Sequence, residues 1–311
     1  MTMRRWLPVV LRLAGTAAGL TYIAWKVDFR EAGDALARIS IATFAVAAAL
    51  VALNVVIGAV RWQAVLRAYG ATAIPPLRRL IHLYFVAFFY NNYLPGAVAG
   101  DVARGVVTRE AFGDQGTTGA LAVVLVERAL GLFALFALLA IGLLTARGGN
   151  ANLDTGSLGV WTALGCAASC ALVIALPAAR RLATVLPGPL RRIAEKLPAL
   201  RDPGQFALAI VLSLGTQVCI ALAGWTILAA LAPIDFTTSL LIVPIAAATT
   251  FLPITVGGAG AREAVYVELC GRLLGMAEPV ALAASLGLWL AHLVIGLVGL
   301  VAQVAGRKRA A

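Results

Sequence analysis

Long apolar runs dominate the pattern of hydrophobic and polar positions along the chain. They occupy residues 7–25, 40–60, 117–145, 157–176, 205–231 and 279–305. A hydrocarbon core about 30 Å thick needs about 20 apolar residues for each helical crossing, so each run is long enough to span a membrane. We therefore predict an all-α polytopic membrane protein with about six full transmembrane helices.

Two further stretches have a different pattern. Residues 80–116 and 237–275 begin apolar, break at proline and glycine, and continue with more polar residues. This pattern is typical of broken helices. A simpler alternative is that Pro95 and Pro253 only kink ordinary spans.

The basic residues predict how the spans are oriented, because cytoplasmic loops collect Lys and Arg. The basic loops are residues 61–79, residues 180–201 and the tail 307–309. The connectors at Arg147 and at 232–235 hold few cations and are predicted to lie outside. Only one net crossing separates residue 79 from Arg147, and the run 117–145 provides it. The stretch 80–116 is therefore predicted to enter and leave on the cytoplasmic side, and 237–275 on the outer side.

The same rule predicts that both chain ends lie in the cytoplasm, and we expect the protein to lie in the cytoplasmic membrane. Arg4 and Arg5 followed by an apolar run resemble a signal peptide, but no small-residue cleavage site precedes Lys26, so we predict a retained first helix. The connector 26–38 fits less well, because it would be external yet holds three cations, a conflict that its three acids reduce but do not remove.

Composition excludes most other classes of protein. Apolar residues make up 61% of the chain before glycine is counted, and charged residues make up 13%; in globular proteins the values are about 45–50%, with glycine included, and about 25%. The net charge of +11 is explained by basic loops, so no nucleic acid partner is expected. The sequence contains no metal-ligand spacing, no nucleophile with its base and no nucleotide-binding loop. We therefore expect no metal, no cofactor and no enzyme activity.

The two broken stretches also resemble each other. Residues 94–104 align without a gap to residues 252–262, at an offset of 158, and Leu, Pro, Val, Gly, Ala and Arg coincide. This predicts two repeats, residues 1–145 and 146–311, each with two spans, a re-entrant hairpin and one further span. Because each repeat crosses the membrane an odd number of times, the two are inverted, as in many secondary transporters.

Irregular backbone cannot face lipid and survives only inside protein or beside water, so the hairpins predict a cavity. Their special backbone positions are Pro95, Gly96, Gly100, Pro253, Gly257, Gly258 and Gly260.

Charges inside the predicted spans are the strongest chemical signal. Glu127 and Arg128 lie roughly 15 Å into the run that begins near residue 117, where charges are costly and usually functional. Neighbouring residues on a helix point about 100° apart, so each needs its own partner. The six groups predicted to surround one aqueous cleft are Asp101, Arg104, Glu127, Arg128, Arg262 and Glu263. We expect Asp101 to face Arg128, and Glu127 to face a hairpin arginine. The alternative is a neutral network that only locks the hairpins in place.

Other polar residues admit two interpretations. Asn91 and Asn92 could hydrogen-bond a polar headgroup or cap a broken helix. Arg61 and Trp62 are most simply an interfacial anchor at the end of the second span. Gln217 is expected to join two helices by a hydrogen bond.

The motifs together resemble a known family. They are Arg61-Trp62, residues 88–95 (FFYNNYLP), Gly100-Asp101, Arg104, Glu127-Arg128, Pro253 and residues 257–263 (GGAGARE). In this order they are similar to the lysylphosphatidylglycerol synthase transmembrane, or flippase-like, family, over most of the chain. The chain resembles a stand-alone member that lacks the soluble synthase domain.

The resemblance implies a lipid translocase, a flippase or scramblase, which agrees with the intramembrane charges. Arg104, Arg128 and Arg262 would offset a phosphate, while the acidic residues would hold those arginines or bind a cationic headgroup. The implied partner is a membrane lipid with a polar or anionic headgroup: a phospholipid, an aminoacyl-lipid or an isoprenoid-linked lipid. An accessory subunit that binds lipid-synthesis enzymes is the alternative, and a lipid-modifying enzyme is a third.

Overall fold

The computed structural model describes residues 3–94, 99–146, 155–181, 183–185, 187–251, 255 and 258–308, and within these ranges it is helical with no strand. The α-helices are α1 (Met3–Lys26), α2 (Phe29–Ala37), α3 (Ile41–Ala68), α4 (Leu77–Tyr93), α5 (Ala99–Val107), α6 (Gly116–Ala146), α7 (Thr155–Arg181), α8 (Gly188–Glu195), α9 (Pro203–Ala229), α10 (Phe236–Ala248), α11 (Ala261–Leu274) and α12 (Glu278–Lys308). Within the described ranges, three 3₁₀ turns lie between them: η1 (Arg109–Gln115), η2 (Ala183–Val185) and η3 (Thr249–Phe251).

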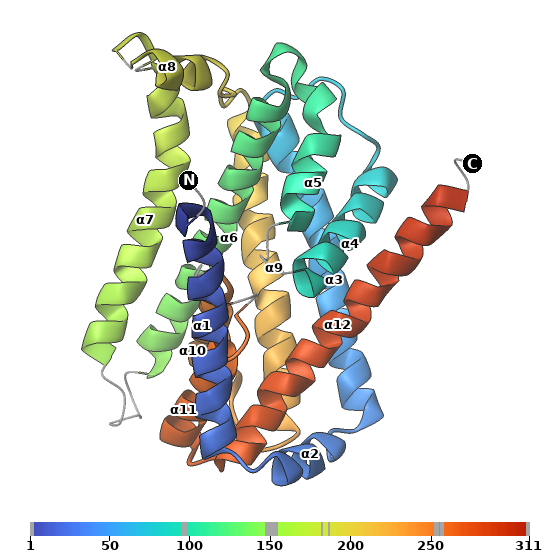
Figure 1. Cartoon of the computed structure of the whole chain (residues 1–311), viewed down its shortest axis with the longest axis vertical. Helices are drawn as coiled ribbons and strands as arrows, with labels where there is room; N and C mark the ends of the chain where they lie inside the picture. Colours follow the sequence, from blue (N-terminus) through green and yellow to red (C-terminus); the bar gives the residue numbers. More distant parts are fainter. Residues whose placement is uncertain are drawn as a thin grey trace.

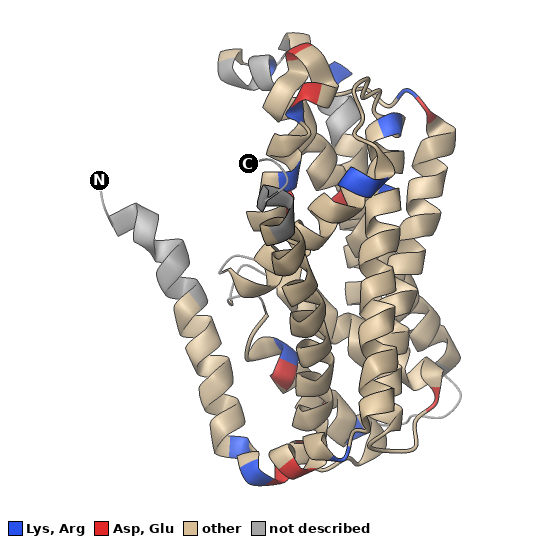
Figure 2. Cartoon of the chain, turned by 90° about the vertical axis from the view of Figure 1, so that its right-hand side faces the viewer, with Lys and Arg blue, Asp and Glu red and all other residues tan. Residues whose placement is uncertain are grey.

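Each predicted apolar run falls on one long helix. Among the described residues, five segments are long and apolar enough to cross a membrane: Ile41–Ala68, Arg109–Thr145, Gly156–Ala175, Pro203–Ala229 and Glu278–Val304. The first predicted span coincides with α1, which has 24 residues but is not one of these five. Most Lys, Arg, Asp and Glu residues lie toward the two ends of the bundle (Figure 2). The chain is therefore a multi-pass membrane protein.

Both broken stretches form pairs of short helices. α4 packs against α5, and α10 packs against α11. The first pair lies toward the upper end of the molecule and the second toward the lower end (Figure 1). The segments that join each pair include Pro95, Gly96, Pro253 and Gly257, which lie outside the described residues.

The order of elements and several helix contacts recur in the two halves of the chain. Each half has a long helix, a second long helix, a broken pair and a third long helix. α4 packs on α12 as α10 packs on α6, α3 contacts α12 as α9 contacts α6, and α3 packs against α9 between the halves. The broken pairs are thus held by equivalent long helices from the opposite half.

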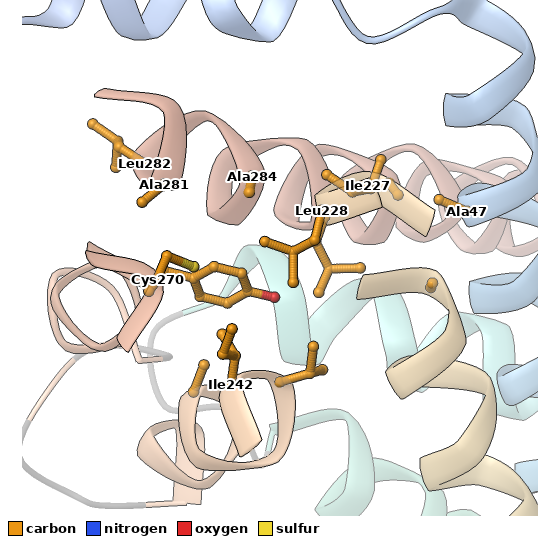
Figure 3. Close-up of a cluster of buried hydrophobic side chains, with 14 of the residues drawn as sticks. Ala47, Ile227, Leu228, Ile242, Cys270, Ala281, Leu282 and Ala284 are labelled. Atoms are coloured by element: carbon orange, nitrogen blue, oxygen red, sulfur yellow. The ribbon is translucent and has the colours of Figure 1, made fainter. Parts of the chain in front are cut away.

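A large apolar core holds the second broken pair. It includes Ile227 of α9, Ile242 of α10, Cys270 of α11 and Leu282 of α12 (Figure 3). These side chains are almost fully buried. Their packing sets the position of α11 relative to α10 and α12, and thereby the position of the residues at its start.

The charges of the connector 26–38 lie at the end of α1, on the short helix α2, and at the two residues that flank α2. Asp28 caps α2, since its Oδ1 accepts hydrogen bonds from the backbone N–H groups of Arg30 and Glu31. The Lys26 Nζ lies 3.2 Å from a Glu278 carboxylate oxygen and 3.5 Å from one of Glu268. Acidic partners therefore offset part of the positive charge of this connector.

Candidate functional site

The site is built around one buried carboxylate. Glu127 lies within α6 and is 1% exposed. Its Oε2 accepts a hydrogen bond from Arg104 at 2.6 Å. Its Oε1 accepts hydrogen bonds from Arg61 at 3.1 Å and from the Tyr84 hydroxyl at 2.8 Å. One carboxylate thus joins α3, α4, α5 and α6, and the predicted contact between Glu127 and a hairpin arginine is confirmed.

Arg104 is the most enclosed of these cations. It is 3% exposed, and its guanidinium carbon lies 4.3 Å from the ring centroids of both Trp62 and Tyr84. Its Nη2 also donates to Asp101 at 3.2 Å. Ion pairs and two aromatic faces together offset the cost of burying this charge.

Arg128 has a separate partner, as its orientation on α6 requires. Its Nε and Nη2 donate to Asp101 Oδ2 at 2.9 and 2.7 Å. This confirms the predicted contact between Asp101 and Arg128. The Arg128 side chain is 25% exposed, far more than Arg104, so it is the more accessible of the two guanidinium groups.

We use the term ion cluster for five charged residues: Arg61, Asp101, Arg104, Glu127 and Arg128. A cavity of about 540 Å³, the polar cavity, lies beside it. Its polar lining includes Arg61, Asn91, Asn92, Asp101, Glu127, Arg128 and Arg262. Side chains from both broken pairs therefore meet at one cavity.

Not all six predicted groups line this cavity. Asp101, Glu127, Arg128 and Arg262 do, whereas Arg104 and Glu263 do not, although each forms an ion pair with a residue that does. The prediction that all six surround the cleft is therefore wrong for Arg104 and Glu263, whose charged groups are instead buried in ion pairs with Glu127 and Arg262.

Glu263 has two contacts within its own broken pair. Its Oε1 accepts hydrogen bonds from the adjacent Arg262, and its Oε2 accepts from the Gly260 backbone N–H at 2.7 Å. Gly258 and Gly260 have φ angles of 82° and 81°, a conformation that favours glycine. Glu263 therefore caps the start of α11 and presents Arg262 at the cavity.

The asparagines also have local contacts. Asn91 Oδ1 accepts a hydrogen bond from the Gly100 backbone N–H at 2.9 Å, and Asn92 Nδ2 donates to the Phe88 carbonyl at 2.8 Å. Of the two interpretations of Asn91, capping of the second helix of the broken pair, α5, is the one observed. A Cβ on Gly100 would lie 2.0 Å from the Ala87 carbonyl oxygen, so glycine permits the close packing of α4 on α5.

The predicted interfacial anchor at Arg61 and Trp62 is wrong. α3 continues to Ala68, so both residues lie well before its end, and Trp62 is fully buried. Sequence reasoning also missed Tyr84, for which the apolar surroundings in the sequence contained no signal. The prediction for Gln217 is confirmed, since its Nε2 donates to the Gly131 carbonyl at 3.2 Å, joining α9 to α6.

The ion cluster is not electrically balanced. Three guanidinium groups, those of Arg61, Arg104 and Arg128, face the two carboxylates of Asp101 and Glu127. Arg262 is balanced by Glu263. Among the charged side chains described at this site, one net positive charge therefore remains beside the polar cavity, where an anionic group would be stabilised.

Comparison with known families identifies the chain. The sequence profile of the lysylphosphatidylglycerol synthase TM region matches residues 9–299. The chain therefore belongs to this family, and the match covers nearly all of it. A comparison with curated proteins found no match.

Proposed function

We propose that this member of the lysylphosphatidylglycerol synthase TM region family is a lipid translocase of the cytoplasmic membrane. It moves a polar, phosphate-bearing headgroup between the leaflets through the polar cavity, while the hydrocarbon chains stay in the bilayer. The observation that carries the proposal is the net positive charge of the ion cluster beside a cavity of about 540 Å³ among membrane helices.

Arg128 is the residue best suited to bind the phosphate. The carboxylate of Glu127 is already shared between two arginines and Tyr84, so it holds the cluster together. Arg128 is partly exposed and presents a planar guanidinium, which can form two parallel hydrogen bonds to a phosphate. When a phosphate binds Arg128 in place of Asp101, Asp101 keeps its contact with Arg104. Its carboxylate is then available to a cationic part of the headgroup.

The path across the membrane follows from an inverted repeat. In this proposal α4 and α5 form a re-entrant hairpin from the cytoplasmic side, and α10 and α11 form one from the outer side. The repeated order of elements and the equivalent helix contacts support this arrangement. Arg104 and Arg262 are equivalent positions at the offset of 158 residues, and only the first has a buried carboxylate partner on a long helix.

Reconstitution tests the proposal directly. The protein is placed in phosphatidylglycerol-containing vesicles with a fluorescent phospholipid, and a membrane-impermeant quencher reports the fraction in the outer leaflet. We expect translocation by the wild type and about a tenfold lower rate for Arg128→Ala, the factor for one lost charged hydrogen bond. Arg191→Ala removes an exposed arginine, 53% exposed in its pair with Glu195, and should retain the wild-type rate.

Two other outcomes would contradict the proposal. If the labelled lipid stays in its original leaflet, the protein is better explained as an accessory subunit that binds lipid. If mass spectrometry finds a chemically altered lipid after incubation, the protein is an enzyme. An unchanged rate in Arg128→Ala would remove Arg128 from the proposed path.

A further inference from the structure

The polar cavity extends along α3 beyond the ion cluster. Asn54, Gly58 and Arg61 of this helix all line it. Their spacing of four and three residues places them on one face of the helix. Asn54 precedes Arg61 by roughly 10 Å along the helix axis. The wall of the cavity therefore includes a part of α3 about two turns away from Arg61.

α9 supplies a second amide to the same part of the wall. α3 and α9 pack against each other and run in opposite directions (Figure 1). A Cβ on Gly215 would lie 3.8 Å from the Ile57 side chain, which sets the register of the pair. One turn back along α3 from Ile57 is Asn54, and the residues that follow Gly215 on α9 include Gln217. Gln217 also lines the polar cavity, so two carboxamides lie at a similar depth in its wall.

Both amides have hydrogen-bonding groups that the protein does not use. The Asn54 side chain is partly accessible and forms no hydrogen bond with the described part of the chain. Gln217 Nε2 donates to the Gly131 carbonyl, which orients the side chain, and its Oε1 accepts no hydrogen bond from a described residue. Asn54 lies near the middle of the 28-residue helix α3, where a polar group without a partner is costly. Both groups are therefore suited to a polar ligand that enters the cavity.

The chemistry of these amides favours an uncharged hydroxyl group. A carboxamide offers both a donor and an acceptor, and a hydroxyl group needs both. A phosphate has a stronger partner in the guanidinium of Arg128 and would face the lone pairs of the amide oxygens. An ammonium group would leave the Asn54 donors unused and would be repelled by the net positive charge of the ion cluster.

We propose that Asn54 and Gln217 form a second subsite of the polar cavity, which binds an uncharged hydroxyl group of the headgroup while Arg128 binds its phosphate. This inference rests on the proposed function, since it makes Asn54 a specificity-determining residue for the translocated lipid. A headgroup without the hydroxyl group would displace water from the two amides without replacing its hydrogen bonds, and would therefore bind less tightly.

Lipid binding measures this selectivity without requiring translocation. Native mass spectrometry of the purified full-length protein in detergent gives the Kd of phosphatidylglycerol and of phosphatidylpropanol, whose headgroup has the same phosphodiester charge but no hydroxyl group. We expect the wild type to bind phosphatidylglycerol about fivefold more tightly, the factor for one neutral hydrogen bond. Asn54→Leu should bind the two lipids equally. Its Tm should not fall below that of the wild type, because Asn54 has no hydrogen bond with the described residues to lose.

Two variants serve as controls. Arg128→Ala should weaken the binding of both lipids and keep the ratio of their Kd values, because the phosphate is common to them. Thr226→Val removes a hydroxyl group of α9 that donates to the Leu222 carbonyl of the same helix. Thr226 does not line the polar cavity, so this variant should keep both Kd values of the wild type.

Three outcomes separate the subsite from the proposed function. Equal affinities of the wild type for the two lipids would overturn the subsite. A preference for phosphatidylglycerol that persists in Asn54→Leu would overturn the role of Asn54. The expected preference in binding, found together with no translocation of phosphatidylglycerol in vesicles, would refute the proposed function while the subsite stands.

Discussion

Glu127→Gln is the sharpest test of the ion cluster. The substitution keeps the size of the side chain and removes its negative charge. Arg61 and Arg104 would then lie in a buried site with only the Asp101 carboxylate, which is already paired with Arg128. We expect a substantial loss of stability, because a guanidinium buried without its partner keeps the full cost of leaving water.

The magnitude follows from the distances. At an effective dielectric constant of about 20, opposite unit charges 3.1 Å apart, as in the Arg61–Glu127 pair, attract each other by about 5 kcal/mol. Removing one partner of a buried pair costs about 3–5 kcal/mol in measured cases. Arg104 keeps Asp101 at 3.2 Å, so we expect a loss of about 3 kcal/mol, near the lower end of that range.

Thermal unfolding of the purified protein in detergent measures this loss. At about 2 °C for each kcal/mol in a chain of this size, the Tm should fall by about 6 °C. Glu195→Gln is the matched control, since Glu195 pairs with Arg191 at 2.8 Å but both side chains are about half exposed. That variant should change the stability by less than about 0.5 kcal/mol.

A double variant separates charge from packing. Glu127→Gln combined with Arg61→Gln removes one cation together with the anion. The double variant should therefore lose less stability than the sum of the two single losses, by about 0.5–3 kcal/mol. Equal Tm values for Glu127→Gln and the wild type, or strictly additive losses in the double variant, would refute the view that a shared buried charge holds this cluster together.

Two further predictions concern local structure. Gly100→Ala should destabilise the protein by about 1–3 kcal/mol through overpacking against Ala87, whereas Gly159→Ala, with open space around it, should be neutral or slightly stabilising by the same unfolding assay. The Thr238 backbone N–H holds the pKa of Asp235, the N-cap of α10, below its usual value. The contribution of the Asp235 carboxylate to the stability of the fold is therefore present above pH about 4 and is lost as the pH falls further. Asp235→Ala should cost about 1 kcal/mol at pH 7, and a difference from the wild type that does not shrink on acidification would contradict this account.

Much of the architecture could be predicted from the sequence because the membrane imposes strict requirements on it. The thickness of the hydrocarbon core determines how long an apolar run must be, and every predicted run falls on a long helix. The high cost of charge in this environment singled out Glu127 and Arg128, and the angle between adjacent helical residues required separate partners for them. The order of motifs was sufficient to indicate the family that the profile match shows.

The sequence predicted the Asp101–Arg128 contact, but only the tertiary structure showed that Arg61 and Tyr84 also bind Glu127. α3, α6 and α9 are apolar around most of their circumference, so no hydrophobic stripe indicates which face of each turns inward. The depth of Arg61 depends on how far α3 continues beyond the apolar run, and the role of Tyr84 depends on the packing of α4 against α3. Glu263 caps its own helix through a hydrogen bond to backbone, which depends on the positive φ of Gly260. The hydrocarbon core of the membrane requires long apolar helices, which can be recognised in the sequence. The rotation and contacts of these helices are set by close packing between residues far apart in the chain.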